Sequence, residues 1–203
     1  MDDPKVRLVV VQKAAQIGWT FGLVGYLLKT IAERPTSIIA LFPKEGTARE
    51  FMDEKFTPAA KETPRMAGKI DVGTSRKNGN RALFKKFPGG FLKVSGSNSV
   101  SNVKSTPTEL VVVEEPDDTA TDLKDQGDAL RLVRERIKRY RRGKMILGGT
   151  PSTAGISRVE EYVKLSDQRV LPVACHDCGE RHVLDWQNVS WLSRDAGPPH
   201  PVY

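Results

Sequence analysis

A lysine, a glycine and a threonine follow an apolar run near the start of the chain. The stretch VVVQKAAQIGWT places Lys13, Gly18 and Thr20 between a predicted buried strand and a predicted amphipathic helix. A bound triphosphate needs backbone N–H groups at a helix N-terminus, a cation and a hydroxyl for Mg²⁺. Gly18 permits close backbone approach, Thr20 supplies the hydroxyl, and Lys13 can reach back across the turn on its flexible side chain. The stretch therefore predicts a phosphate-binding turn.

The lysine stands at an unusual position for such a turn. In the common phosphate loop, G-x-x-x-x-G-K-[ST], Lys directly precedes the hydroxyl residue. Trp19 occupies that slot here, and Lys13 stands where the first glycine is usual. For this stretch alone, two interpretations stay open: a nucleotide site with a displaced lysine, or an ordinary strand–turn–helix with an incidental lysine.

Two adjacent acids end a second apolar run, ELVVVEE. In nucleotide hydrolases with a phosphate loop, a buried strand delivers an acid that holds Mg²⁺. A second acid beside it can polarise the attacking water as a general base. Successive side chains on a strand diverge, so Glu114 and Glu115 can do these two jobs. The alternative is a strand that meets solvent through charged residues.

A third apolar run, KMILGGT, ends in small residues and a hydroxyl. It places Gly148, Gly149 and Thr150 at the end of a predicted strand. Parallel sheets bind ligands at the carboxyl ends of their strands, so this turn is expected near the other two. A hydroxyl beside a γ-phosphate could respond to hydrolysis and pass the change to a neighbouring segment. The alternative is a plain strand-to-loop turn.

Two cysteines near the end of the chain have the spacing of metal ligands. Cys175 and Cys178 in CHDCGERH form half of a zinc site, and the glycine after them allows a tight turn. His182 is a candidate third ligand, and His176 or His200 a candidate fourth. The alternative is a pair of reduced cysteines without metal. A redox role is not favoured, because the pair does not begin a helix after a strand.

Apolar runs predict the strands that must position these residues. The runs are continuous rather than alternating, which indicates a parallel sheet covered on both faces. Four of them are strong, 91–96 predicts a fifth strand, and 81–87 alternates enough for an edge strand or hairpin arm. The four strong runs are residues 7–11, 37–42, 109–114 and 144–149.

Helical patterns fall between the strands. The first follows Thr20 and ends before Pro35, and Thr47 with Glu50 predicts a capping box that starts the second. A third helix is expected over 120–142. This alternation predicts an α/β fold with a mostly parallel central sheet flanked by helices. The apolar stripe of the first helix comprises Phe21, Val24, Leu27, Leu28 and Ile31.

The composition indicates a globular chain with a basic surface. It has 203 residues, 38% hydrophobic and 28% charged, with a net charge of +7, so a polyanionic partner is plausible beside simple solvation. Residues 131–142 contain seven basic residues and one acid, Glu135. This run predicts DNA contact, a solvated helix face or a subunit contact.

No apolar run is long enough to span a membrane, and the first residues do not form a signal peptide. Two cysteines without secretion signals indicate a reducing compartment.

Taken together, the three turns resemble the ATPase domain of the large terminase subunit of tailed double-stranded-DNA phages, in its lambda-like branch. In that family the phosphate loop commonly begins with a basic residue and can lack the Lys before Ser/Thr, as here. The resemblance spans nearly the whole chain. It includes FPKEGTAREFMDEKFTPAAKETP, QGDALRLVRERIKRYRRGKMILGGTPS and VACHDCGERHVLDW.

The resemblance implies an additional-strand, catalytic-glutamate (ASCE-type) phosphate-loop NTPase core over residues 1–168, followed by a C-x-x-C segment over 169–203. It implies ATP and Mg²⁺ as ligands, with Glu115 as the catalytic carboxylate and Thr20 and Glu114 at the metal. Glu114 departs from the family's usual Asp by one methylene. The residues implied to contact the nucleotide are Lys13, Gly18, Trp19, Thr20, Glu114, Gly149 and Thr150.

For the whole protein, the resemblance implies a DNA-packaging motor in the host cytoplasm. Its expected partners are double-stranded DNA, the small terminase subunit and the portal protein, on which a ring, expected to be a pentamer, assembles. A nuclease domain is expected beyond residue 203. A neighbouring subunit is expected to supply an arginine, for which Arg49 and Arg76 are candidates.

Two other functions compete with this one. A helicase-like nucleic-acid remodelling ATPase should carry a Lys directly before the hydroxyl residue, where this chain has Trp19. A non-enzymatic, basic, zinc-containing nucleic-acid-binding module should show no nucleotide affinity. The order of the three turns favours the packaging motor.

Overall fold

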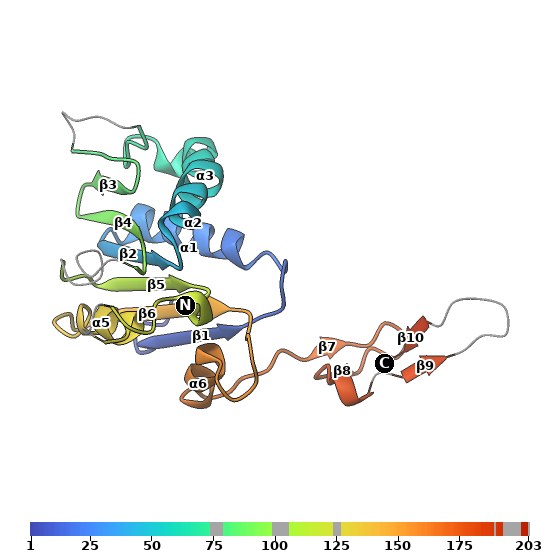
Figure 1. Ribbon diagram of the computed structural model, residues 1–203. Helices are drawn as coiled ribbons and strands as arrows, with labels where there is room; N and C mark the ends of the chain where they lie inside the picture. The colour runs from blue at the N-terminus through green and yellow to red at the C-terminus, as the bar shows by residue number, and fades with distance from the viewer. Residues whose placement is uncertain (74–78, 99–105, 124–126, 189, 193–199, 203) are drawn as a thin grey trace. The chain divides into compact units, whose positions relative to one another are not determined.

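The computed structural model describes the chain except residues 74–78, 99–105, 124–126, 189, 193–199 and 203 (Figure 1). The described chain forms two compact units, Met1–Ser166 and Asp167–Tyr203. The first holds the parallel sheet, and the second holds short strand pairs.

The first unit is built on a six-stranded sheet, counted over the described residues, in the order β1-β6-β5-β2-β4-β3. The first five strands in this order are parallel, and β3 pairs antiparallel with β4 at the edge. The mostly parallel sheet and the edge hairpin are therefore confirmed. The strands are β1 (Leu8–Gln12), β2 (Ser37–Phe42), β3 (Phe84–Phe87), β4 (Gly90–Gly96), β5 (Leu110–Glu114) and β6 (Lys144–Gly149).

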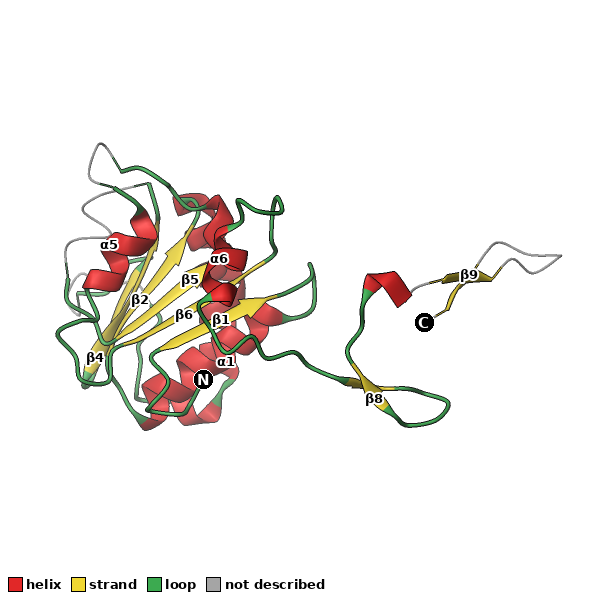
Figure 2. Cartoon of the chain, turned by 90° about the horizontal axis from the view of Figure 1, so that it is seen from below, coloured by secondary structure: helices red, strands yellow, loops and turns green. Residues whose placement is uncertain are grey.

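Both faces of the sheet are buried, which explains why the strand sequences do not alternate. On β2, Ile38 and Ala40 belong to a core shared with α1 (Trp19–Glu33), whereas Ile39 belongs to a core shared with α5 (Ala129–Glu135) and α6 (Arg158–Lys164). Figure 2 shows the helices on both sides of the strands. Among the described residues of this unit, the other α-helices are α2 (Glu45–Glu50) and α3 (Thr57–Glu62).

The first helix matches its predicted apolar stripe except at its start. Val24, Leu27, Leu28 and Ile31 are buried, but Phe21 is 73% exposed. Phe21 stands in the first turn of α1, next to the loop that leaves the edge of the sheet, and this turn has solvent on its outer side. The prediction was wrong for that one position.

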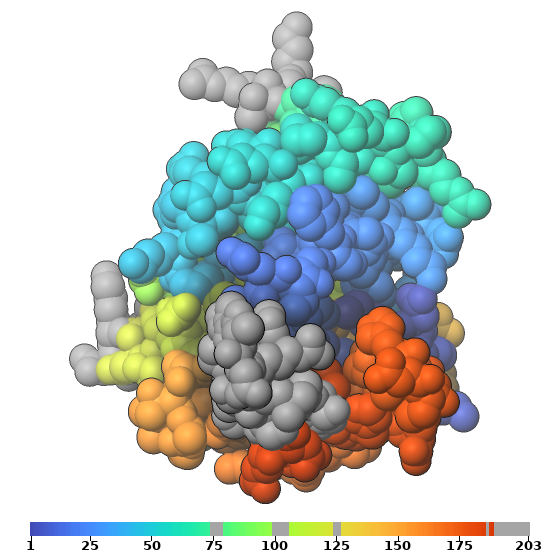
Figure 3. All heavy atoms as spheres, turned by 90° about the vertical axis from the view of Figure 1, so that its right-hand side faces the viewer, coloured from blue at the N-terminus to red at the C-terminus, as the bar shows by residue number. Residues whose placement is uncertain are grey.

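The second helical segment begins earlier than its predicted capping box. α2 starts at Glu45 with Lys44 as N-cap, and the Thr47 hydroxyl donates to the Lys44 carbonyl from inside the helix, at 3.2 Å. The segment continues through a π-helix, η1 (Phe51–Phe56), into α3. In Figure 3 this segment, in cyan, covers α1, in blue. The prediction of a capping box at Thr47 was wrong. Only two residues separate β2 from α2, so Thr47 already lies inside the helix.

The helix predicted over 120–142 is much shorter. α5 begins after Gly127, whose φ of 92° no helix accepts, and the Asp128 side chain caps it by accepting from the Leu130 amide. Beyond Glu135 the chain runs in turns closed by i→i+3 hydrogen bonds. Basic residues four apart in this run repel one another in a helix, which favours the early end.

The second unit consists of short paired strands. β7 (Val173–Ala174) pairs antiparallel with β8 (Arg181–His182), and β9 (Ser190–Leu192) pairs with β10 (His200–Val202). A single turn of 3₁₀ helix, Trp186–Asn188, lies between the two pairs in the sequence. Within the described part of the whole chain, no helix has the length and apolar content that a membrane crossing requires.

Candidate functional site

The three turns singled out in the sequence meet at one edge of the first unit. Lys13, Glu115 and Thr150 directly follow β1, β5 and β6, and β6 lies between the other two strands. The carboxyl ends of neighbouring parallel strands lie at the same edge, so these residues converge. The sequence indicated the edge, and the strand order explains why residues about 100 positions apart touch.

One cluster joins a cation, a carboxylate and a hydroxyl. Lys13 Nζ donates to Glu115 Oε1 at 2.7 Å and to Thr150 Oγ1 at 3.2 Å. The Thr150 amide donates to Glu115 Oε2 at 2.9 Å. The Lys13 side chain is 8% exposed and that of Glu115 is 31% exposed. The displaced lysine is therefore directed into the site, and its charge is balanced by the candidate catalytic carboxylate.

A second cluster surrounds Glu114, the last residue of β5. Its Oε1 accepts from Thr20 Oγ1 and its Oε2 from Trp19 Nε1, both at 2.7 Å. Burial raises the pKa of Glu114, and the hydrogen bonds from Thr20 and Trp19 oppose this rise. The Glu114 carboxylate and the Thr20 hydroxyl thus lie together at the start of α1. Oxygen atoms of these two kinds are ligands that Mg²⁺ can take.

Trp19 fits this position because the strand opposite has no side chain there. A Cβ built on Gly148 would lie 2.1 Å from Cε2 of the Trp19 ring. The indole therefore lies directly against β6, and its N–H is held toward Glu114. In this structure Trp19 is a partner of Glu114, a contact that the sequence did not predict.

The turn between β1 and α1 contains two residues in the left-handed conformation. Gln16 and Gly18 have φ values of 59° and 81°, and Gly18 is the N-cap of α1. No described side chain caps this N-terminus, so the first amide groups of a 15-residue helix are available to a ligand. Such a helix start favours a phosphate through its N–H groups and its dipole.

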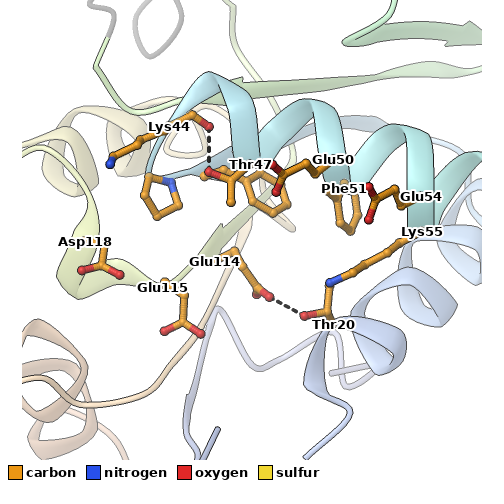
Figure 4. A pocket seen from close by; sticks show the side chains of 12 residues that line it. Thr20, Lys44, Thr47, Glu50, Phe51, Glu54, Lys55, Glu114, Glu115 and Asp118 are labelled. Carbon is orange, nitrogen blue, oxygen red and sulfur yellow. Dashed lines mark hydrogen bonds between the residues drawn. The ribbon is translucent and has the colours of Figure 1, made fainter. Parts of the chain in front are cut away.

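A cavity of about 560 Å³ opens beside Thr20 and the two glutamates. Figure 4 shows side chains of α2 and η1 on one wall and Thr20, Glu114 and Glu115 on the other. Its lining is of mixed charge. The charged residues in it are Lys44, Glu50, Glu54, Lys55, Glu114, Glu115 and Asp118.

Two residues that no sequence pattern singled out lie just behind this site. Asp117 accepts hydrogen bonds from the turn after Thr150, and Arg158 holds the backbone after Glu115. Burial raises the pKa of Asp117, but hydrogen bonds from Ser152 and Val159 outweigh it and lower the pKa to about 2. Nothing in the run EEPDD distinguished Asp117 from Asp118, because only the fold brings Ser152 to it.

The zinc prediction is not supported. Cys175 and Cys178 lie in the turn between β7 and β8, closed by the Gly179 amide donating to the Cys175 carbonyl at 3.0 Å. His182 lies along β8, where it is in register with Val173 rather than beside the cysteines. Among the described residues, no three His, Cys, Asp or Glu side chains are gathered to hold a metal ion.

The basic run after α5 lies away from the phosphate turn. Residues 136–143 precede β6, so they lie at the amino end of that strand, opposite the edge that carries Thr150. The Arg7 guanidinium donates to the Arg141 and Tyr140 carbonyls and holds this turn against the start of β1. Of the two candidate trans-acting arginines, Arg49 pairs with Glu45 at 2.6 Å, and Arg76 lies outside the described residues.

Comparisons with known proteins match nearly the whole chain to one family. A family model described as "Phage terminase large subunit gpA, ATPase domain" matches residues 1–201. The chain is 24% identical over 186 residues to the large terminase subunits of Escherichia phage lambda and Enterobacteria phage P21. These matches cover 91% of this chain but only 29% of each relative.

A solved structure supports the fold. The large terminase ATPase domain of Thermus phage P74-26 superposes with a TM-score of 0.59 at 13% identity, over 89% of this chain and 73% of that one.

Proposed function

The chain belongs to the family of phage terminase large subunit gpA ATPase domains, and we propose that it binds and hydrolyses Mg·ATP where β1, β6 and β5 end. The observation that carries the proposal is the convergence of Lys13, Glu115 and Thr150 beside the Thr20–Glu114 pair. A cation, a helix start, two metal-ligand oxygens and a carboxylate base are the parts that phosphoryl transfer to water requires.

The phosphates bind at the turn before α1. The amide groups that follow Gly18 donate to phosphate oxygens, and Lys13 moves its charge from Glu115 to the β/γ-phosphates. Thr20 and Glu114 supply the oxygen ligands that fit Mg²⁺. Mg²⁺ held by these residues would neutralise negative charge on the phosphates. Trp19 holds the Glu114 carboxylate in place from its other side.

Glu115 is the general base. While Lys13 pairs with Glu115, the ammonium group balances the charge of the carboxylate. Once Lys13 turns to the phosphates, the Glu115 carboxylate can accept a proton. A water oxygen then bonds to the γ-phosphorus, the bond from that phosphorus to the β–γ bridging oxygen breaks, and Glu115 receives the water proton. ADP and inorganic phosphate are the products.

Thr150 contacts both members of this pair, so it responds to the same change. Its hydroxyl accepts from Lys13 and its amide donates to Glu115. When the lysine leaves Glu115, both contacts of Thr150 change together. The turn after β6 thereby couples the state of the phosphates to the segment that follows it.

In the whole protein, this cycle drives double-stranded DNA into a procapsid. The chain spans 29% of the length of its curated relatives, so this step rests on the family rather than on the geometry. The partners we propose are DNA, the small terminase subunit, the portal protein and further copies in a ring. A helicase-like function or a non-enzymatic binding module is not favoured by the family match.

Single-turnover hydrolysis, with the chain in excess over labelled ATP, tests the proposed chemistry. Glu115→Gln should lower the rate by about 10²–10⁴-fold, because the amide cannot take the proton. Asp53→Asn, an equal change of charge at an exposed position on η1, should leave the rate unchanged. Equal rates for the parent and Glu115→Gln would exclude Glu115 as the base.

A further inference from the structure

Asp117 connects two turns of the candidate site that are 35 residues apart in the sequence. Its Oδ2 accepts from the Ser152 amide at 2.8 Å and from the Ser152 hydroxyl at 2.7 Å. Its Oδ1 accepts from the Val159 amide, in the first turn of α6, at 2.9 Å. One carboxylate therefore binds the turn after Glu115, the turn after Thr150 and the start of a helix.

Arg158 makes a second connection at the same place. Its Nη1 donates to the carbonyls of Pro116 at 3.1 Å and Thr119 at 3.0 Å, and to the Thr119 hydroxyl at 2.6 Å. Its Nη2 pairs with Asp128, the N-cap of α5. The side chain is 12% exposed, so these hydrogen bonds are largely shielded from water. The backbone on both sides of Asp117 is thus fixed to α6.

These contacts hold a strained residue. Glu115 has a φ of 48°, a left-handed conformation that is costly for a residue with a side chain. It lies between β5 and the 3₁₀ turn Pro116–Asp118, whose position Asp117 and Arg158 determine. Packing is close here: a Cβ on Gly149 would lie 2.7 Å from Pro116 Cδ and 3.1 Å from Val159 Cγ2.

We propose that Asp117 is a positioning residue that holds Glu115 against the phosphate site and joins that site to α6. The proposal rests on the function proposed above. It adds the series of contacts by which a change at the phosphate site reaches α6. A change at Thr150 moves Ser152, Ser152 moves with Asp117, and Asp117 carries the change to the start of α6. Asp117 acts through Glu115 and Ser152 and does not touch the nucleotide.

Asp117→Asn tests the positioning role. The amide has the same shape but offers one acceptor oxygen, so it cannot serve both Ser152 and Val159. The single-turnover rate should fall roughly tenfold to a hundredfold because Glu115 loses its position. The affinity for Mg·ADP, measured by calorimetry, should stay unchanged, as should the rate of Asp53→Asn. An unchanged rate in Asp117→Asn, or a loss of rate matched by a loss of affinity or folded protein, would overturn the proposal.

Hydrogen–deuterium exchange tests the path independently of hydrolysis. Adding Mg·ATPγS to the parent should change exchange in Arg158–Lys164; in Asp117→Asn the nucleotide should still bind without that change. A purely structural role would instead raise exchange in α6 equally with and without nucleotide, and would refute the path. A parent that neither binds nor hydrolyses nucleotide contradicts the proposed function itself. An active parent with an equally active Asp117→Asn contradicts the positioning role alone.

Discussion

Trp19 and Lys13 make different contacts at the two ends of the turn between β1 and α1. Trp19 fills the slot before the hydroxyl residue, but its indole lies on Gly148 and donates to Glu114. The positive charge comes instead from Lys13, at the other end of the turn, and reaches Glu115 and Thr150. The sequence predicted these residues as a set, because each type is needed for phosphate chemistry. It could not predict the Trp19–Glu114 contact, which depends on how closely α1 approaches β6.

The close approach of Trp19 makes Gly148 sensitive to substitution. In Gly148→Ala the new Cβ would meet the indole at 2.1 Å, so the ring must move and lose its hydrogen bond to Glu114. We expect a loss of about 1–3 kcal/mol in the free energy of unfolding, measured in urea. Gly46→Ala, where the Cβ meets nothing within 4 Å, is the matched control. Equal stabilities of the two variants would contradict the packing of Trp19.

Asp117 should make stability depend on pH in the acid range. Its pKa of about 2 in the folded chain lies below the ordinary value of 3.8. The carboxylate therefore stabilises the fold above about pH 4, and this contribution is lost as the pH falls toward 2. The difference in unfolding free energy between the parent and Asp117→Asn should shrink over this range. A difference that is constant from pH 6 to about pH 2 would contradict the hydrogen bonds assigned to Asp117.

At the scale of elements, strands were predictable and helix ends were not. The apolar runs predicted the strands because a parallel sheet buries both faces. The helix ends depended on local contacts instead: Asp128 caps α5 after Gly127, and α2 starts at Glu45 ahead of the apparent capping box. The early end of α5 leaves most of the basic run in turns.

Helix α1 carries a glycine that the fold does not require. A Cβ on Gly25 meets nothing within 4 Å, and the residue lies in the middle of the helix. Gly25→Ala should raise the free energy of unfolding by about 0.5–1 kcal/mol, because alanine loses less backbone freedom on folding. Gly68→Ala, at a φ of 72°, should give no such gain. A destabilised Gly25→Ala would mean that α1 packs against something at that position.

At the scale of the molecule, the strand order assembles the site. β6 lies between β1 and β5, so the last of the three turns in sequence becomes the middle one in space. The apolar runs did not reveal this order, because their similar composition does not say which strands are neighbours. Residues 136–143 precede β6 and Thr150 follows it, so they lie at opposite ends of that strand.

Because the basic run and the phosphate turn lie at opposite ends of the strands, substitutions in the basic run should affect DNA binding without affecting nucleotide binding. If the exposed basic run contacts DNA, Arg139→Ala with Arg142→Ala should weaken non-specific duplex binding. The slope of log affinity against log salt should become shallower by about 1 for each DNA phosphate that the variant no longer binds. Mg·ATP affinity should not change, and Lys61→Ala, exposed on α3, should alter neither property. An unchanged salt slope would leave this run without a role in DNA binding.

The most direct measurement is calorimetric titration of Mg·ATP into the chain, beside Lys13→Ala, Glu115→Gln and the control Lys29→Ala on the exposed side of α1. We expect the parent to bind Mg·ATP, and Lys13→Ala to lose about 1.5–3 kcal/mol of binding free energy, because it removes a charged hydrogen bond to phosphate. Glu115→Gln and Lys29→Ala should keep the parent's affinity. Equal affinity of Lys13→Ala and the parent would show that Lys13 is not the phosphate lysine. A folded parent without measurable affinity would contradict the nucleotide site as a whole.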